Sequence, residues 1–168
     1  VTVEGKKIKI RRIQLEEDPG RLIYEGTSDR TKITLVDYNR AGTPLVEIVT
    51  EPDFENPKEV RDFLNILSDL LKNLGVADPS LEGAMRADAN VSLISVSNVN
   101  EDGTIDRGIL QAAERIEIKN ISSHKGAEKA LVYEISRQKN TIMHGGEIKQ
   151  ETRHWDENRG ITISMRSK

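Results

Sequence analysis

The stretch that decides the fold is V-D-Y-N-R-A-G-T-P-L-V-E-I-V-T-E-P-D, residues 36–53. It begins with a short apolar run, passes through the turn formers Gly42 and Pro44, and returns as a strand with apolar residues on both faces. Glu47 lies in the middle of that strand. A carboxylate in such a place is costly unless it is paired, hydrogen-bonded or bound to a cation. Glu47 is therefore either half of an ion pair with one of the 25 Lys and Arg residues of the chain or a ligand for a cation.

Two further segments place charged side chains in the middle of a predicted strand. In residues 85–93, alanine and aliphatic side chains alternate with short polar ones, and in residues 114–120 isoleucines alternate with charged ones. Alternation with period two predicts strands with one covered and one open face. A half-solvated strand shows the same pattern, but here the polar side chains of 85–93 are short. The open faces would carry Arg86, Asp88, Asn90, Ser92, Arg115, Glu117 and Lys119.

Two helices are predicted, at residues 56–74 and 124–144. Asn56, Pro57 and Glu59 form an N-terminal capping pattern, and Gly75 ends the first helix. Ser122 or Ser123 would cap the second helix. The predicted inner stripes are Val60, Phe63, Leu64, Leu67, Leu71 and Leu74 in the first helix, and Ala127, Leu131, Ile135 and Ile142 in the second.

The order of elements is strands, helix, strands, helix and a hairpin over residues 147–166. This order predicts an α+β fold, in which a largely antiparallel, curved sheet carries the helices on one face. A β-bulge is expected at Arg11 and Arg12, a loop over residues 21–32, and an irregular insertion over residues 94–113. Trp155 is expected in the core.

The other face of that sheet would gather Glu47, Arg86, Asp88, Arg115, Glu117 and Lys119, with Arg153 and Arg166 as further candidates. Carboxylates hold Mg²⁺, while arginine and lysine neutralise phosphate oxygens. Such a face predicts that a nucleotide is bound and a phosphoryl group transferred. Because Mg²⁺ needs only one or two protein carboxylates, scattered single acids are the expected pattern.

Composition excludes several classes of protein. With 4% aromatic residues, the chain lacks the platform that stacks single-stranded bases, and its net charge of −3 provides no global basic field. There is no cysteine, which rules out disulfides and thiolate chemistry and is consistent with a cytoplasmic location. Neither a signal peptide nor a membrane-spanning apolar run is recognised, so no membrane association is expected.

Six motifs resemble a known family. They are L-E-E-D-P-G at 15–20, the block at 35–53, M-R-A-D-A-N-V-S-L at 85–93, R-I-E-I-K-N at 115–120, Q-E-T-R at 150–153 and S-M-R-S-K at 164–168. Together they resemble the B subunits of aspartyl/glutamyl-tRNA amidotransferases. The paralogous E subunit, specific for Glu-tRNA(Gln), is the nearest alternative. The run E-I-K-N-I-S-S at 117–123 is more similar to the B form.

The resemblance implies a catalytic cradle domain similar to the glutamine synthetase fold. It implies ATP-dependent phosphorylation of the side-chain carboxylate of mischarged Glu-tRNA(Gln) or Asp-tRNA(Asn), with Mg²⁺. Ammonia from a partner amidase A subunit, accompanied by a small C subunit where present, then displaces the phosphate. The enzyme is thus expected to be a ligase that forms a carbon–nitrogen bond.

The resemblance also implies roles for particular residues. The Mg²⁺ ligands would be Glu47 and either Glu16 or Glu17. Asp88 and Glu117 would form an adjacent metal or ammonia-handling position, and the phosphate or nucleotide contacts would come from Arg86, Lys119 and Arg115.

Residues 1–168 are expected to be part of one catalytic domain. The family's N-terminal segment, which contributes a histidine and a glutamate, and its C-terminal helical and tail regions are not among them, so this piece alone is expected to be inactive. The competing hypothesis is a non-catalytic RNA-binding or assembly module, whose acidic and basic face would be a protein interface. Only the catalytic face should bind nucleotide in a Mg²⁺-dependent manner.

Overall fold

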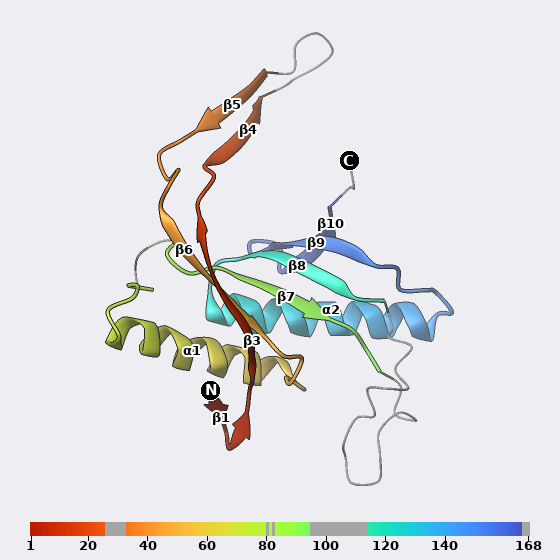
Figure 1. The fold of residues 1–168 in the computed structure, drawn as a ribbon. Helices are drawn as coiled ribbons and strands as arrows, with labels where there is room; N and C mark the ends of the chain where they lie inside the picture. Colours follow the sequence, from red (N-terminus) through yellow and green to blue (C-terminus); the bar gives the residue numbers. More distant parts are fainter. Residues whose placement is uncertain (26–32, 80, 82, 95–113, 166–168) are drawn as a thin grey trace. The chain divides into compact units, whose positions relative to one another are not determined.

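The computed structural model describes residues 1–25, 33–79, 81, 83–94 and 114–165, and Figure 1 shows their elements in chain order. The chain divides into two compact units. The first consists of Val1 and Lys6–Asp53, and the second of Thr2–Gly5 and Phe54–Lys168. The short strands β1 (Thr2–Val3) and β2 (Lys6–Lys7) pair with each other.

The first unit is built from two antiparallel strand pairs. Strand β3 (Ile10–Glu17) pairs with β6 (Pro44–Thr50), and β4 (Arg21–Glu25) pairs with β5 (Ile33–Asp37). The register of β3 against β6 shifts between Ile10 and Arg12, so the predicted bulge is confirmed. The turn between β3 and β4 requires glycine, because Gly20 has a φ of +86° and a Cβ there would lie 2.7 Å from the carbonyl oxygen of Asp37.

The predicted loop over residues 21–32 is wrong in its first part, since residues 21–25 form β4. The segment R-L-I-Y-E contains two residues that favour strands, isoleucine and tyrosine, and it pairs in register with I-T-L-V-D of β5. The charged residues at both ends of this short apolar run make the segment look like a loop in the sequence. Its pairing with β5 shows that it is a strand.

The second unit contains a mixed four-stranded sheet in the order β10-β9-β8-β7. Its strands are β7 (Ala87–Val91), β8 (Ile116–Ile121), β9 (Glu151–Asp156) and β10 (Ile161–Ser164). The β7–β8 and β9–β10 pairs are antiparallel, and the latter is the predicted hairpin. Strands β8 and β9 are parallel, because helix α2 carries the chain back across the sheet between them. The α+β prediction is therefore confirmed, with one parallel pairing in the sheet.

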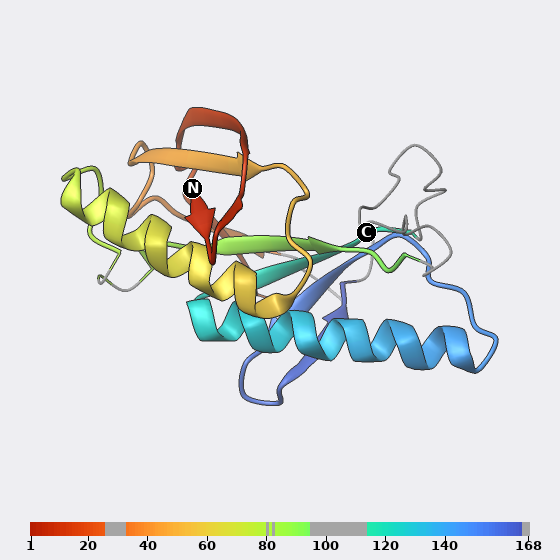
Figure 2. The same ribbon diagram turned by 90° about the horizontal axis from the view of Figure 1, so that it is seen from below.

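Helix α1 (Pro57–Asn73) and helix α2 (His124–Met143) pack against each other, and α2 lies along one face of the sheet (Figures 1 and 2). The backbone N–H of Glu59 donates to Asn56 Oδ1 at 3.0 Å, which confirms the predicted cap. The core of this unit includes Phe63, Leu64, Leu67, Ile116, Ile118, Ile121, Ala127, Ala130, Leu131 and Trp155. The prediction that Trp155 is a core residue is thus confirmed.

Both predicted inner stripes are wrong at their C-terminal ends. Leu74 is 66% exposed, because it is the C-cap of α1 rather than part of its packed face. Ile142 is 49% exposed, and the later turns of α2 instead bury Glu134 and Gln138. Helical periodicity predicts that aliphatic residues face the core. The later turns of α2 instead lie opposite polar groups of the sheet, such as Thr162, which bind Glu134.

The predicted single sheet is also wrong. Glu47 belongs to the β3–β6 pair of the first unit, while Asp88, Glu117 and Lys119 belong to the four-stranded sheet of the second. Alternation of residue types predicts the direction of side chains, but it does not predict which strands pair.

In the described part of the chain, neither helix is long and apolar enough to cross a bilayer. The predicted insertion at 94–113 and the candidate Arg166 lie outside the described residues, apart from position 94.

Candidate functional site

A bulge in strand β8 organises the charged residues of the second unit. Ala89 pairs with Ile118 and Ala87 pairs with Ile121, so Asp88 alone faces both Lys119 and Asn120. Asn120 has a φ of +67°, in the left-handed region where asparagine is tolerated better than most residues. Its side-chain Nδ2 donates to the carbonyl oxygen of Trp155 at 3.3 Å. The bulge thereby places Lys119 opposite Asp88 on the open face of the sheet.

Lys119 bridges two carboxylates on this face. Its Nζ lies 2.8 Å from Asp88 Oδ2 and 3.3 Å from Glu117 Oε1. The hydrogen bond that Lys119 donates to Asp88, together with the charge of both carboxylates, raises the pKa of Lys119, although partial burial opposes the shift. The three side chains carry a net charge of −1 and remain partly open to solvent.

Glu117 is held at its second oxygen as well. Thr152, its neighbour on the parallel strand β9, donates its hydroxyl to Glu117 Oε2 at 3.0 Å. An open polar cavity of about 450 Å³ lies beside this carboxylate. It is lined by Arg115, Glu117, Gln150, Glu151 and Thr152. The sequence prediction missed Gln150, Glu151 and Thr152 as lining residues, although all three lie in the Q-E-T-R motif.

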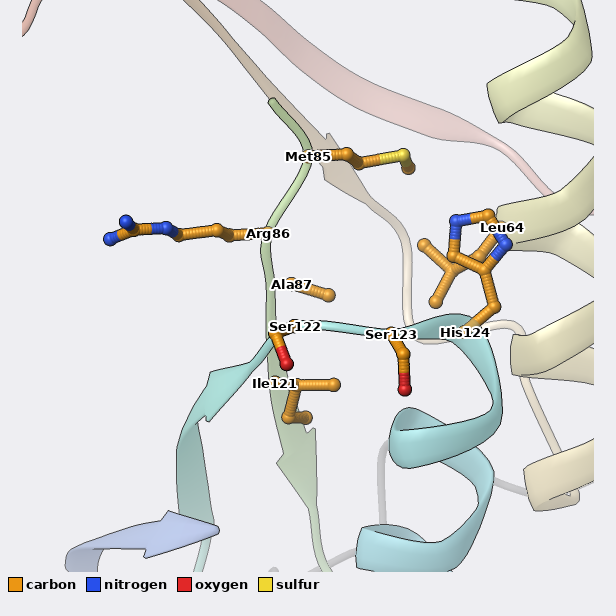
Figure 3. Close-up of a pocket in the computed structure, with 8 residues that line it drawn as sticks. All are labelled: Leu64, Met85, Arg86, Ala87, Ile121, Ser122, Ser123 and His124. Atoms are coloured by element: carbon orange, nitrogen blue, oxygen red, sulfur yellow. The ribbon is translucent and has the colours of Figure 1, made fainter. Parts of the chain in front are cut away.

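The two arginines assigned to this site differ in position. Arg115 lines the polar cavity beside Glu117. Arg86 precedes β7, and Figure 3 shows its guanidinium pointing away from a small pocket at the start of α2. Neither guanidinium forms an ion pair with another described residue.

Glu47, in the first unit, already has a cationic partner. Its Oε2 accepts a hydrogen bond from Arg12 Nη2 at 2.6 Å, and both side chains are about half exposed. The ion pair predicted as one of the two alternatives for Glu47 is therefore present, with Arg12 as the partner. Because such exposed pairs contribute little to stability, the pairing leaves Glu47 able to exchange Arg12 for another cation.

The register of β3 against β6 distinguishes Glu16 from Glu17. Gln14 faces Glu47 and Glu16 faces Leu45, so Glu16 lies two residues along the same face as Glu47. Gln14 Nε2 also donates to Glu16 Oε1 at 3.2 Å. Glu17 faces Pro44 and points to the opposite side of the ribbon.

The donor sets of the two units fit Mg²⁺ to different degrees. Glu16 and Glu47 provide two carboxylates on one face, which is enough for an ion that keeps several waters and takes further oxygens from a phosphate. Asp88 and Glu117 already share the ammonium of Lys119, so a metal there would have to displace it. The described residues contain no cluster of three or more acidic or histidine side chains arranged around a common metal position.

A buried polar network behind β9 was not predicted. Glu134 is fully buried on α2 and accepts hydrogen bonds from Arg137, Gln138 and Thr162. Burial acts to raise the pKa of Glu134, but these hydrogen bonds outweigh it and hold the pKa below its ordinary value. The spacing of Glu134, Arg137 and Gln138 on one helical face is a signal that could have revealed the network.

Arg153 belongs to this network rather than to the open face, so its assignment as an additional site residue is wrong. It faces Ile118 across the sheet, and its Nε donates to Thr162 Oγ1 at 2.8 Å. Its Nη1 donates to Glu151 Oε1 at 2.6 Å. The next residue in a strand points the opposite way, which is why Thr152 reaches the open face.

Comparison with known proteins decides the family. Residues 1–168 match the family described as the GatB/GatE catalytic domain. The chain belongs to this family. The identification predicted from the six motifs is thus confirmed.

Several members of the family are similar to this chain. The B subunit of the aspartyl/glutamyl-tRNA(Asn/Gln) amidotransferase of Haloquadratum walsbyi is 58% identical over 164 residues, covering 97% of this chain and 33% of that protein. The protein of the same name from Natronomonas pharaonis is 58% identical, covering 98% of this chain and 34% of that protein. That from Methanosarcina barkeri is 51% identical, covering all of this chain and 31% of that protein. The chain thus spans about a third of the length of these GatB/GatE relatives.

Proposed function

We propose that the protein containing this chain converts a mischarged aminoacyl-tRNA into the amide form, acting on Glu-tRNA(Gln), Asp-tRNA(Asn) or both. The observation that carries the proposal is the Asp88–Lys119–Glu117 arrangement beside an open polar cavity in a chain that matches the GatB/GatE catalytic domain along its whole length. A cation between two carboxylates on an open sheet face is suited to a reaction in which a phosphate and an amine meet.

The proposed reaction has two steps, phosphorylation of the carboxylate and then amide formation. An oxygen of the substrate's side-chain carboxylate attacks the γ-phosphorus of ATP, and ADP leaves. The nitrogen of ammonia then attacks the activated carbonyl carbon, phosphate leaves, and one proton is lost from the nitrogen. Neither step requires a protein nucleophile, so the contribution of the protein is positioning and electrostatic stabilisation.

Glu47 and Glu16 are the residues that would hold Mg²⁺, whose charge would neutralise phosphate oxygens of ATP. Arg12 would release Glu47 when the ion is bound. Glu17, on the opposite side of the ribbon, is left out of this assignment.

The residues of the second unit would act on the phosphate and the amine. Lys119, Arg86 and Arg115 provide positive charge toward phosphate oxygens. Asp88 and Glu117 are carboxylates that can orient ammonia and accept the proton that the nitrogen loses. This division assigns the metal to one pair of acids and the amine to the other.

The partners follow from the proposed reaction and from the relatives, whose name describes them as a subunit. Ammonia would come from glutamine through a partner amidase A subunit, with a small C subunit where present. The substrate would be a mischarged tRNA, and the reaction would take place in the cytoplasm with translation.

Substitution of Asp88 tests the division into two steps. In the intact protein assembled with its amidase partner, Asp88→Asn should still form ADP on mischarged tRNA, while amide formation falls by at least about tenfold. The same assay on the unsubstituted protein, with Glu-tRNA(Gln) and Asp-tRNA(Asn) in turn, determines which tRNA is used. Equal loss of ADP and amide would place Asp88 in the phosphorylation step, and absence of both products from the unsubstituted protein would refute the proposed function.

The alternative is a non-catalytic RNA-binding or assembly module. It is favoured by the finding that Glu47, Asp88 and Glu117 already have cationic partners within the chain. Calorimetric titration of the intact protein with ATP separates the two. Binding that requires Mg²⁺ supports the enzyme, whereas tRNA binding without any Mg²⁺-dependent affinity for ATP supports the module.

A further inference from the structure

Thr152 is the residue of the Q-E-T-R motif that contacts the candidate site. Its hydroxyl donates to Glu117 Oε2 at 3.0 Å, and Glu117 Oε1 lies 3.3 Å from Lys119 Nζ. The two oxygens of one carboxylate are therefore held by two different neighbours. Two separate contacts define the plane of a carboxylate, whereas one contact leaves it free to rotate.

The position of Thr152 is itself determined by the sheet behind it. On the next residue, Arg153 Nε donates to Thr162 Oγ1 at 2.8 Å, and that hydroxyl donates to the buried Glu134 at 2.8 Å. Arg153 Nη2 also donates to the carbonyl oxygen of Thr162 at 2.8 Å. Because Arg153 is anchored on the helix side, Thr152 must point to the open side, next to Glu117 in the parallel register.

The chemistry of threonine suits this position. A β-branched side chain has few rotamers in a strand, so its hydroxyl keeps one direction at little entropic cost. The hydroxyl donates one hydrogen bond and can still accept others, and Thr152 lines the polar cavity together with Arg115 and Gln150.

We propose that Thr152 is a positioning residue that orients the Glu117 carboxylate toward the amine during amide formation. The inference rests on the proposed function and deepens it, since it names the group on which the geometry of Glu117 depends. Thr152 itself exchanges no proton with the substrate. Its effect passes entirely through the hydrogen bond to Glu117.

Two opposite substitutions test this role. Thr152→Val keeps the shape of the side chain and removes the hydroxyl, whereas Thr152→Ser keeps the hydroxyl and removes the methyl group. In the intact protein with its amidase partner, and with ammonium chloride as nitrogen source, Thr152→Val should lower kcat for amide formation about tenfold or more. Its KM for ATP should not change, and Thr152→Ser should retain most of the activity. If threonine served only packing, the order of the two variants would be reversed.

The matched control is Thr141→Val on helix α2. It also removes one hydroxyl hydrogen bond, from Thr141 Oγ1 to the carbonyl oxygen of Arg137 at 3.0 Å, but away from the open face. A crystal structure of Thr152→Val should show the Glu117 carboxylate rotated from its position in the unsubstituted protein.

Three results would overturn the inference: full activity of Thr152→Val, an equal loss in Thr152→Ser, or an equal loss in Thr141→Val. Each of them requires the unsubstituted protein to be active in the same assay. Inactivity of the unsubstituted protein with both mischarged tRNAs would instead refute the proposed function.

Discussion

At the scale of single residues, the role of a carboxylate in this chain depends on its neighbours in the folded structure and not on its residue type. Glu47, Glu117 and Glu134 all lie within regular elements, yet one forms an exposed pair, one lines an open cavity and one is fully buried. The first two were predicted as site residues because alternation placed them on open strand faces. Glu134 was not predicted, because a glutamate in a helix is normally solvated.

Glu47→Gln tests the metal assignment at this scale. In the intact protein, the substitution should lower amide formation by about 10²–10³ because it removes a charge needed at the transferred phosphate. The folded state should hardly change, since the exposed pair with Arg12 contributes at most about 1 kcal/mol. The readouts are the rate at several Mg²⁺ concentrations and a thermal melt.

The matched control is Glu51→Gln, which removes a similar exposed pair with Arg11 in the same unit. It should leave the Mg²⁺ dependence unaltered. Normal activity of Glu47→Gln at limiting Mg²⁺ would remove Glu47 from the metal site.

At the scale of elements, two features of the β7–β8 pair determine where the charged groups lie. The alternation of β7 was readable in the sequence, and Ala89 faces the same side as the fully buried Ile118. The bulge at Asn120 was not readable, because a positive φ at a single asparagine leaves no periodic signal.

The alternation of β7 can be tested with one added carboxylate at two positions. Ala89→Asp would place a charge on the helix-facing side and should cost several kcal/mol. Ser92→Asp, directly after the strand and exposed, should melt close to the unsubstituted protein. Similar losses in melting temperature for the two variants would contradict the assigned faces.

The bulge can be tested with two substitutions at Asn120. Asn120→Gly and Asn120→Val both lose the hydrogen bond to Trp155, but only valine is strained at a φ of +67°. Asn120→Val should therefore be less stable than Asn120→Gly by about 1–2 kcal/mol in denaturant unfolding. Equal stability of the two variants would show that the left-handed conformation is not required.

At the scale of the whole molecule, the buried Glu134 and the partly exposed Glu151 couple stability to pH. Glu134 joins α2 to β10 through Thr162, and Glu151 joins β9 to β10 through Ser164. Burial acts to raise the pKa of both carboxyls, but their hydrogen bonds hold both pKa values below the ordinary range. Such groups stabilise the folded protein above their unfolded pKa of about 4.3, and the stabilisation is lost as pH falls through the folded value.

The free energy of unfolding should therefore decrease as pH falls from about 5 to about 3. Glu134→Gln should lower stability at pH 7 by about 3 kcal/mol, because it leaves Arg137 and Arg153 without their buried partner. It should also reduce the acid slope, which is the change in the free energy of unfolding per pH unit between about pH 3 and pH 5, by up to about 1.4 kcal/mol per pH unit. Urea unfolding at several pH values measures both effects.

Glu147→Gln, at an exposed position before β9, is the control and should leave the acid slope unchanged. An acid slope in Glu134→Gln that equals that of the unsubstituted protein would show that Glu134 does not carry this linkage.

Local patterns in the sequence determined much of this protein. The cap at Asn56, the alternation of β7 and β8, the β9–β10 hairpin and the family were all predictable, and the cap of α2 was narrowed to Ser122 or Ser123, of which the structure uses Ser123. These features depend on neighbours a few residues apart, whose spacing the chain displays directly.

Only the tertiary structure decided the features that depend on residues distant in the chain. It assigned Glu47 to a different sheet from Asp88, placed Glu16 rather than Glu17 on the same face of its strand pair as Glu47, and brought Thr152 to Glu117. Each outcome follows from the pairing and register of strands, and a shift of one residue would reverse every face. Periodicity within one strand contains no information about its partner, which is why these contacts could not be predicted from the sequence.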